Sequence, residues 1–175
     1  MNAAFNELLK QVGSASLPPV ASWHPEREGQ IDIRIRNDGT WLHEGTVVRR
    51  KSIAKVFSTI LKREGDHYFL VTPVEKLRIQ VDDVPFVAVD FEASGKGQEQ
   101  QILFKTNMDD VVLLDDAHPL TIETTTSGPR PYMLVRNGLN ARLVTDVFYR
   151  LADLVEDPDG DPLYLWSSGC RFRVS

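Results

Sequence analysis

Residues 69–92, FLVTPVEKLRIQVDDVPFVAVDFE, contain three short apolar runs that are separated by turn-forming residues. Pro73 interrupts the chain after the first run, and Asp82-Asp83-Val84-Pro85 interrupts it after the second. Runs of this length between such breaks are typical of strands rather than helices. In the middle run the residues alternate in character, so that one side of the strand carries Lys76, Arg78 and Gln80. The stretch therefore predicts three tightly connected strands of a sheet with one polar face.

The pattern extends toward the N-terminus. IDIRIR, residues 31–36, alternates Ile with polar residues, and Asp38-Gly39 supplies a turn, so residues 31–48 are predicted to form hairpin strands. Residues 51–63 change to helical spacing, which predicts a helix. Its apolar face would consist of Ile53, Val56, Phe57, Ile60 and Leu61.

A polar loop at residues 93–100 precedes a second series of predicted strands at 101–106, 111–114, 120–125 and 132–136. Asn137-Gly138 is a dipeptide favoured in type I′ hairpin turns. A second helix is then predicted from the spacing of apolar residues, and strands at 163–168 and 171–174 follow it. This helix would carry Leu143, Val147, Phe148, Leu151 and Leu154.

The N-terminal segment is different in character. Residues 2–12 place apolar side chains at helical spacing, and Gly13 is predicted to end that helix. The Pro-containing stretch that follows predicts an ordered arm or a linker. We therefore divide the chain into a helix and arm at 1–24, an N-terminal lobe at 25–96 and a C-terminal lobe at 97–175.

The two halves of the chain resemble each other. A strand ending in Arg36-Asn37, a helix with Val56-Phe57 and a further strand are matched by Arg136-Asn137, Val147-Phe148 and the strand after them. The alternative is chance similarity between common amphipathic patterns. A duplication predicts an α+β fold of two similar lobes, each a mostly antiparallel sheet with one covering helix, and a cleft where the lobes meet.

Composition narrows the function classes. The chain has 175 residues and a net charge of −5, with acidic and basic residues interspersed, which disfavours bulk nucleic-acid binding. The one cysteine, Cys170, excludes an internal disulfide, and its strand-like setting favours a half-buried inactive thiol over a nucleophile. The sequence has no apolar run of membrane-spanning length and no secretory leader pattern, so we expect a cytoplasmic protein.

Few residues indicate catalysis. The four histidines lie in separate segments without metal-ligand spacing, and the calcium-loop-like DPDGDP, residues 157–162, lacks the closing glutamate. The Gly-Lys-Gly at 95–97 lacks the other residues of a phosphate-binding loop. No nucleophile elbow is present, and the adjacent aspartates favour solvated loops. Binding is therefore expected rather than catalysis, and no cofactor or metal is indicated.

Two positions leave a binding role open. Trp41 and His43 should share one strand face, where they could stack a planar ring and hold an anion, or Trp41 could cap the core with its indole N–H bonded to a carbonyl. Arg78 lies on the polar face of its strand, which is either solvated or part of a cleft.

Several ordered motifs carry a family resemblance, from about residue 23 to the C-terminus. IDIRIRNDGTWLHEG, RRKSIAKVFSTIL, YFLVTPVEKLRIQVDDVPFVAVDFE, FKTNMDDVV and HPLTI together resemble the bacterial domain-of-unknown-function family 1285. The family's Asp-Gly-x-Trp falls on Asp38 to Trp41 and its His-Glu-Gly on His43 to Gly45. Its remaining motifs fall on Thr72 to Glu75, on Asn107 and Asp110, and on His118 to Leu120.

The resemblance implies a duplicated core, a C-terminal lobe similar to pleckstrin-homology folds, a nucleotide-type ligand in the cleft between the lobes and a part in signalling. It implies no established activity. One departure is visible, because Gly29-Gln30 stands where the family commonly has Gly-Asp before the first strand.

From residues and resemblance together, we expect a regulatory module that binds a small anionic, nucleotide-like molecule. Trp41 would stack, the arginines would bind phosphate or carboxylate, and the other residues would orient polar groups. The alternatives are a protein-interaction adaptor that binds no small molecule, and a metal-assisted hydrolase using Glu75 or His43. The predicted binding residues are Arg34, Trp41, His43, Glu44, Glu75, Arg78, Asn107, His118 and Arg136.

Overall fold

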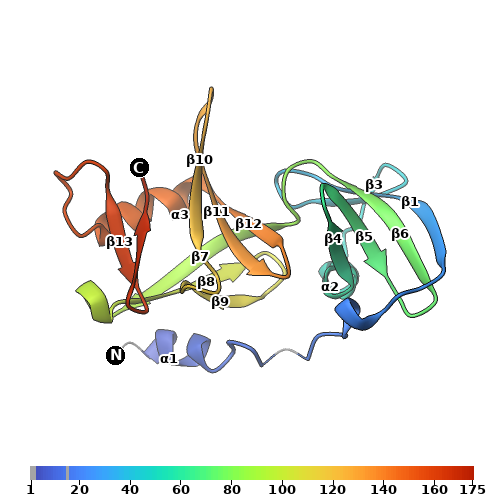
Figure 1. The fold of residues 1–175 in the computed structure, drawn as a ribbon, viewed down its shortest axis with the longest axis horizontal. Helices are drawn as coiled ribbons and strands as arrows, with labels where there is room; N and C mark the ends of the chain where they lie inside the picture. Colours follow the sequence, from blue (N-terminus) through green and yellow to red (C-terminus); the bar gives the residue numbers. More distant parts are fainter. Residues whose placement is uncertain (1–2, 15) are drawn as a thin grey trace. The chain divides into compact units, whose positions relative to one another are not determined.

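The computed structural model describes residues 3–14 and 16–175, and these residues divide into two compact units. The N-terminal unit comprises residues 16–85 with 137–139, and the C-terminal unit comprises residues 3–14, 86–136 and 140–175. Within the described residues, the strands form two six-stranded sheets and one two-stranded sheet (Figure 1). Each six-stranded sheet is accompanied by a helix, which confirms the predicted α+β fold of two similar lobes.

The N-terminal sheet has the strand order β3-β2-β1-β6-β5-β4. Neighbouring strands are antiparallel except for the central pair, β1 and β6, which is parallel. Its strands are β1 (Arg27–Ile35), β2 (Trp41–His43), β3 (Thr46–Val47), β4 (Leu61–Glu64), β5 (His67–Val71) and β6 (Glu75–Val81). Helix α2 (Lys51–Thr59) connects β3 to β4, and the short 3-10 helix η1 (Val20–Ser22) precedes β1.

The C-terminal sheet has the strand order β10-β11-β12-β7-β8-β9, again with a parallel central pair, β7 and β12. Its strands are β7 (Phe86–Ser94), β8 (Gln101–Thr106), β9 (Val111–Leu113), β10 (Leu120–Thr125), β11 (Gly128–Arg136) and β12 (Leu139–Leu143). The other elements of this unit are α1 (Ala3–Leu9), the 3-10 helices η2 (Gly97–Glu99) and η3 (Leu151–Leu154), α3 (Thr145–Arg150), β13 (Tyr164–Ser167) and β14 (Cys170–Arg173).

The two sheets repeat one topology. In each, three strands form a meander, three more strands form a second meander, and the first and sixth strands pair in the centre. The residue correspondence that the sequence suggested is nevertheless wrong. Arg36-Asn37 follows the first strand of its sheet, whereas Arg136 ends the fifth strand and Asn137 begins the turn to the sixth. The sequence pattern matched the two helices to each other, but they do not occupy equivalent places. Helix α2 lies between the two meanders of the N-terminal sheet, whereas α3 follows the second meander of the C-terminal sheet.

Two predicted helices are shorter than expected. The helix expected at 51–63 ends at Thr59, because Ile60 leaves helical geometry with φ −108° and ψ 14°, and Leu61–Glu64 then pair with β5. The buried residues of α2 are Ala54 and Ser58, while Ile53 and Val56 of the predicted apolar face are exposed. Leu143 likewise ends strand β12 and does not begin the second helix.

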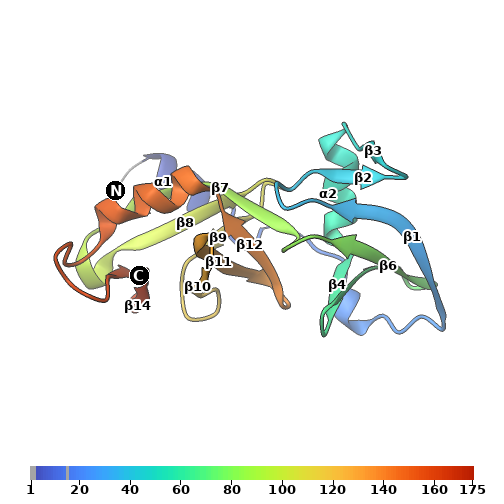
Figure 2. The ribbon, with the colours of Figure 1, turned by 90° about the horizontal axis from the view of Figure 1, so that it is seen from above.

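Helix α1 packs within the C-terminal unit, although it is encoded ahead of the N-terminal unit (Figure 2). Phe5 is fully buried in a cluster with Leu103 and Val111. The helix predicted over residues 2–12 is also shorter than expected, because α1 ends at Leu9 and Gly13, with φ 67°, lies in the turn that follows it. Of the residues predicted for this helix, Asn2 lies outside the described residues.

The division between the units falls at Pro85–Phe86. The sequence-based boundary at 96 and 97 differs from this division because β7, which was assigned to the N-terminal lobe, pairs with β8 and β12. The arm at residues 16–24 belongs to the N-terminal unit, where η1 contacts β4 and Val20 is buried.

Candidate ligand-binding site

A β-bulge interrupts the centre of the N-terminal sheet. Gln30 of β1 pairs with Arg78 of β6, but the next pair is Arg34 with Gln80. Three residues of β1 therefore stand against one residue of β6, so the two strands cannot remain evenly spaced here. Bulges of this kind bend a strand and often lie next to binding sites, where they re-aim side chains.

A groove of ≈ 510 Å³ opens at the bulge. Because side chains alternate across a strand, Gln30 and Asp32 of β1 share the polar face of the sheet with Arg78 and Gln80 of β6. Asp66, in the turn between β4 and β5, and His67 of β5 form a further wall. Ile31, Tyr68, Ile79 and Val81 complete the lining.

Arg78 is the one arginine in this lining, and His67 positions it. An Arg78 Nη lies 2.8 Å from His67 Nδ1. Arginine can only donate, so Nδ1 must accept, and the ring proton of a neutral His67 is then on Nε2. This bond uses one of the five guanidinium N–H groups of Arg78, which leaves others for an anion.

The remaining polar side chains of the groove are unpaired. The structure shows no hydrogen bond from the side chain of Gln30, Asp32, Asp66 or Gln80 to any residue in the described part of the chain. The groove therefore presents one cation, two carboxylates and two amides to solvent. Such a set can bind an anionic group, donors such as hydroxyls, and the polar edge of a planar ring.

Ion pairs on the same sheet face flank the groove. Lys76 Nζ lies 2.8 Å from a Glu28 carboxylate oxygen and 3.0 Å from one of Glu64. These hydrogen bonds, led by the one to Glu28, raise the pKa of Lys76, and the bond from Lys76 lowers the pKa of Glu64. Lys76 is thus neutralised by its neighbours and is not available to a ligand.

Arg34, predicted to bind an anion, is bound instead by Asp82. Its Nε and one Nη lie 2.7 and 3.0 Å from the two carboxylate oxygens. This bidentate pair raises the pKa of Arg34. Asp82 is thus the structural partner of Arg34. Arg34 is not among the residues that line the groove.

Trp41 is not available for stacking with a ligand. Only 2% of it is exposed, and its ring stacks on Phe57 of α2 at a centroid distance of 6.2 Å. The core-capping alternative describes it better, except that the structure shows no hydrogen-bond partner for the buried indole N–H among the described residues.

His43 and Glu44 belong to a hairpin turn. His43 pairs with Thr46 at the end of β2, and the two-residue loop between them has φ 49° at Glu44 and φ 74° at Gly45. Positive φ at both loop positions is the type I′ pattern, in which glycine is favoured. The His-Glu-Gly motif is therefore explained by a turn rather than by a binding site.

Glu75 ends another turn. The Oγ1 of Thr72 accepts hydrogen bonds from the backbone N–H groups of Val74 and Glu75, at 3.4 and 3.2 Å. The Thr72 N–H in turn donates to the Glu75 carbonyl at 2.9 Å. Thr-Pro-Val-Glu thus joins β5 to β6, and Glu75 lies outside the groove lining.

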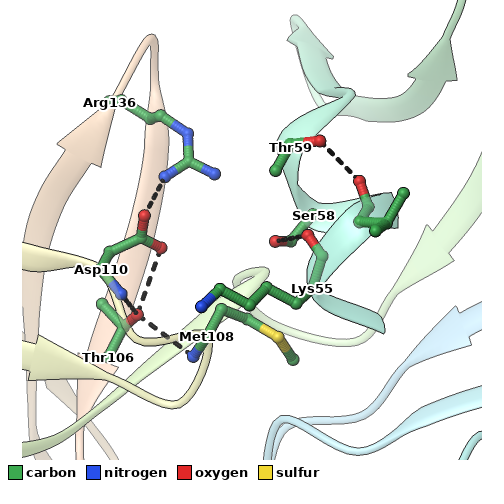
Figure 3. Close-up of polar contacts among 8 residues, drawn as sticks. Lys55, Ser58, Thr59, Thr106, Met108, Asp110 and Arg136 are labelled. Carbon is green, nitrogen blue, oxygen red and sulfur yellow. Dashed lines mark hydrogen bonds and ion pairs between the residues drawn. The ribbon is translucent and has the colours of Figure 1, made fainter. Parts of the chain in front are cut away.

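Asn107 and Arg136 stabilise the β8–β9 connection of the C-terminal unit. An Arg136 Nη donates to Asp110 Oδ1 at 2.8 Å, and the Thr106 hydroxyl donates to Asp110 Oδ2 at 3.2 Å (Figure 3). The Asn107 side-chain oxygen accepts from the Val87 N–H at 3.1 Å. With side-chain exposures of 15% and 17%, Arg136 and Asp110 form a largely buried pair. These contacts hold a loop in place and explain the motif structurally.

His118 also belongs to a turn. Asp115 Oδ1 accepts from the backbone N–H of His118 at 2.8 Å and lies 3.0 Å from its Nδ1. Three of the nine predicted residues, Asn107, His118 and Arg136, are thus in the C-terminal unit and six are in the N-terminal unit, where Arg78 alone lines the groove.

Sequence reasoning missed Gln30, Asp32, Asp66, His67 and Gln80. A partial signal was present, because Gln80 shares its strand face with Arg78 and Asp32 shares one with Arg34. The parallel pairing that brings β1 beside β6 was the missing information. The Gly29-Gln30 departure falls inside β1 rather than before it, and Gln30 lies in the groove.

Two features of the described residues concern the alternative functions. No group of three or more His, Cys, Asp or Glu side chains is placed to hold a metal ion. No helix in this part of the chain is long and apolar enough to cross a membrane.

Comparisons with known proteins agree with the fold. Residues 18–84 match the N-terminal domain, and residues 85–174 the C-terminal domain, of the family described as a domain or protein of unknown function, DUF1285. A DUF1285 family protein from Silicibacter pomeroyi DSS-3 has a crystal structure similar to this one, with a TM-score of 0.85 and 42% identity over 99% of this chain and 94% of that chain. One from Shewanella baltica OS155 has a TM-score of 0.56 and 29% identity over 69% of this chain and 90% of that chain. No curated protein matches the chain. With both domain models matched in order over residues 18–174, the chain belongs to the DUF1285 family.

Proposed function

We propose that the protein is a small-molecule-binding module, and that its ligand occupies the groove at the β1–β6 bulge of the N-terminal unit. The observation that carries this proposal is the exposed Arg78, held by His67 among four polar side chains that have no hydrogen-bond partner in residues 3–14 and 16–175. The groove lining contains no Ser, Thr or Cys that could act as a nucleophile. Binding therefore fits this site better than turnover, and a regulatory role follows if the ligand is a cellular signal.

The lining favours a ligand with a single anionic group. One arginine faces two carboxylates, Asp32 and Asp66, so a polyphosphate would meet more repulsion than attraction. Carboxylates accept hydrogen bonds from sugar hydroxyls, and the amides of Gln30 and Gln80 can pair with the donor and acceptor edge of a base. A nucleoside monophosphate carries all three kinds of group, and we propose this class of ligand.

A thermal-unfolding panel tests the proposal. The full chain would be mixed with the common nucleoside monophosphates, the corresponding nucleosides and triphosphates, and ribose 5-phosphate. A true ligand present at 100 times its dissociation constant stabilises the folded state by about 2.7 kcal/mol. We expect one monophosphate to raise the unfolding temperature, with its nucleoside and its triphosphate having smaller effects.

The variant Arg78→Gln provides the matched test. A charged hydrogen bond contributes about 1.5 to 3 kcal/mol, so affinity should fall by about tenfold or more. Arg49→Gln removes the same charge at an exposed position outside the groove, and it should bind like the parent protein. No response to any ligand in the panel, or equal affinities for the two variants, would contradict the proposal.

A protein-interaction adaptor remains the second candidate, because α2 exposes apolar side chains. Val56 is 63% exposed and Ile53 is 41% exposed, one helical turn apart. Val56→Ser should change the free energy of unfolding by no more than about 0.5 kcal/mol, as expected of a surface position kept apolar for a partner. A larger loss would show that Val56 serves the fold instead. No observation favours the hydrolase alternative.

A further inference from the structure

An apolar cavity, separate from the groove proposed above, lies in the C-terminal unit. Its volume is ≈ 380 Å³, and its walls come from α3 and η3, from the β10–β11 hairpin, from the residue before β13 and from the residues after β14. The lining includes no charged residue of the described part of the chain. Its main apolar contributors are Phe148, Tyr149, Leu151, Val155, Leu163 and Val174.

The walls of this cavity are fixed by packing and by hydrogen bonds. Leu151 is 1% exposed and Val174 is 9% exposed. The Val174 N–H donates to the Leu163 carbonyl at 2.9 Å, and the Leu163 N–H donates to the Ser175 hydroxyl at 2.7 Å. At the mouth, Tyr149 is 70% exposed. A preformed apolar cavity of this kind suits the hydrocarbon part of a ligand, because an apolar chain gains free energy when it leaves water for such a place.

One charged side chain is held against this lining. The Nε of Arg173 donates a hydrogen bond to the backbone carbonyl of Ser175, which is a lining residue. In the part of the chain that the structure describes, no other charged side chain is hydrogen-bonded to a residue of the lining, and Arg173 has no Asp or Glu partner. The bond to Ser175 uses Nε alone, so both Nη groups of the guanidinium remain for a ligand.

The acidic loop of residues 156–162 joins two residues of the lining, but no member of the loop belongs to the lining itself. Its first acid, Glu156, is paired with Arg171 at 3.3 Å. Within the loop, Asp157 Oδ1 accepts a backbone N–H at 3.2 Å, which gives that carboxylate a role in the turn. The charged contact open to a head group at the lining is therefore Arg173.

We propose that this cavity binds a free anionic amphiphile of the fatty-acid kind, with its hydrocarbon chain among the apolar side chains and its carboxylate on Arg173. Charge complementarity selects the anion, because a guanidinium can bind a carboxylate through two parallel hydrogen bonds but repels a cationic head. A free molecule is favoured over a membrane surface, because an anionic bilayer would also face the acidic loop, which a single carboxylate avoids.

The test compares amphiphiles that share an octyl chain and differ in their heads. Octanoate, the isosteric neutral octanamide and octylammonium, each below its micelle-forming concentration, would displace the uncharged dye N-phenyl-1-naphthylamine from the full chain. Physiological salt limits the influence of charges that do not contact the head. We expect one saturable dye site, with octanoate displacing the dye at about three- to fivefold lower concentration than octanamide, as an exposed ion pair provides, and octylammonium the weakest. Octanamide equal to octanoate or better would overturn the assigned head group.

Arg173→Gln tests the contact with the head group. It removes the cation and should abolish the preference for octanoate, while octanamide and the dye bind as to the parent protein. Arg130→Gln is the matched control, because Arg130 is exposed and alternates with the lining residue Pro129 along β11, so its side chain lies on the other face of the hairpin. This control should keep the full preference. Equal preferences in the two variants would contradict the contact with Arg173.

A third variant locates the hydrocarbon chain. Ala152 lines the cavity, so Ala152→Phe should occupy its space and remove saturable dye binding. Ala117→Phe makes the same change at an exposed position outside the lining and should leave dye binding intact. If Ala152→Phe does not fold, Tyr149→Ser at the exposed mouth removes apolar contact area and should weaken the dye by about threefold or more.

Two further outcomes would overturn the proposal. One is dye binding that does not saturate, or that is equal in the Ala152→Phe and Ala117→Phe variants. The other is association of the protein with phosphatidylglycerol vesicles that Ala152→Phe abolishes, which would identify a membrane as the source of the hydrocarbon chain. The nucleotide panel addresses a groove in the other unit, so the failure of one test leaves the other proposal standing.

Discussion

At the scale of single residues, most of the motif positions shape turns. Glu44 and Gly45 form a type I′ turn, and Thr72 and Asp115 accept backbone hydrogen bonds in two others. The type I′ turn predicted at Asn137-Gly138 is confirmed by φ values of 46° and 75°. Turns and binding sites both use polar and small residues whose side chains lie outside the core. A turn motif can therefore be mistaken for a binding motif when only the sequence is known.

Alanine substitutions at two glycines of one loop can separate the energetic cost of positive φ from the cost of steric crowding. Gly95 and Gly97 both have positive φ, at 79° and 55°. A Cβ on Gly97 would meet no neighbouring atom within 4 Å, whereas one on Gly95 would lie 2.6 Å from the Glu99 carbonyl oxygen. Gly97→Ala should therefore cost about 1 kcal/mol of unfolding free energy, and Gly95→Ala about 1 to 3 kcal/mol more.

Urea unfolding of both variants measures this difference. Equal losses for the two substitutions would show that the loop moves to relieve the contact with Glu99, and that crowding at Gly95 is unimportant.

The Arg136–Asp110 pair gives a second prediction at this scale. Asp110→Ala removes the acceptor of both Arg136 and the Thr106 hydroxyl in a largely buried place. The free energy of unfolding should fall by about 2 kcal/mol, while nucleotide binding stays unchanged because the pair is not part of the groove. Asp116→Ala, at an exposed neighbouring loop position, should alter stability by less than about 0.5 kcal/mol.

At the scale of elements, strand existence was easier to predict than strand partners. The strands 101–106 and 120–125 were predicted with the bounds that the structure has. Period-two alternation is a local property, so it can be recognised in isolation. The parallel pairing of β1 with β6 joins segments some forty residues apart, so no local sequence pattern indicates it. The groove depends on that pairing. For this reason the predicted site contains Arg78 but not the residues around it.

An ion pair links helix α3 to β7, and its contribution to stability should be lost at low pH. Arg150 Nη lies 2.8 Å from Asp90 Oδ1, and this hydrogen bond lowers the pKa of Asp90. A carboxyl group with a lowered folded-state pKa contributes stability above its unfolded pKa, about 3.9, and loses that contribution as the pH falls through the folded value. Both side chains are about half exposed, so the contribution is at most about 1 kcal/mol.

Asp90→Asn should therefore be less stable than the parent at pH 7, and the two proteins should converge below about pH 4. Unfolding by urea at a series of pH values measures the convergence. A difference that stays constant down to pH 2 would mean that Asp90 acts through packing and not through its charge.

At the scale of the whole molecule, the duplication could be predicted from the sequence but its residue alignment could not. Six strands in the same order recur in both units, whereas the helices, whose apolar pattern guided the comparison, occupy different places in the two repeats. Amphipathic helices of similar length look alike in sequence whatever their origin. The likeness of the C-terminal lobe to pleckstrin-homology folds stays a prediction.

Helix α1 makes the C-terminal unit discontinuous in sequence, and this arrangement can be tested. Phe5 is fully buried against Leu103 and Val111. Phe5→Ala should lower the free energy of unfolding by about 3 kcal/mol or more, whereas Leu9→Ala, at a side chain that is 36% exposed, should cost much less. Similar small losses for both variants would show that α1 does not dock in solution.

The same discontinuity has a consequence for protein synthesis. The ribosome releases Phe5 roughly a hundred residues before Val111. At translation rates of about 5–20 residues per second, the nascent α1 is without its docking surface for on the order of ten seconds. During that interval its apolar side is open to chaperones. A polypeptide that stalls before β9 never covers it, so uncovered Phe5 would distinguish unfinished chains from finished ones.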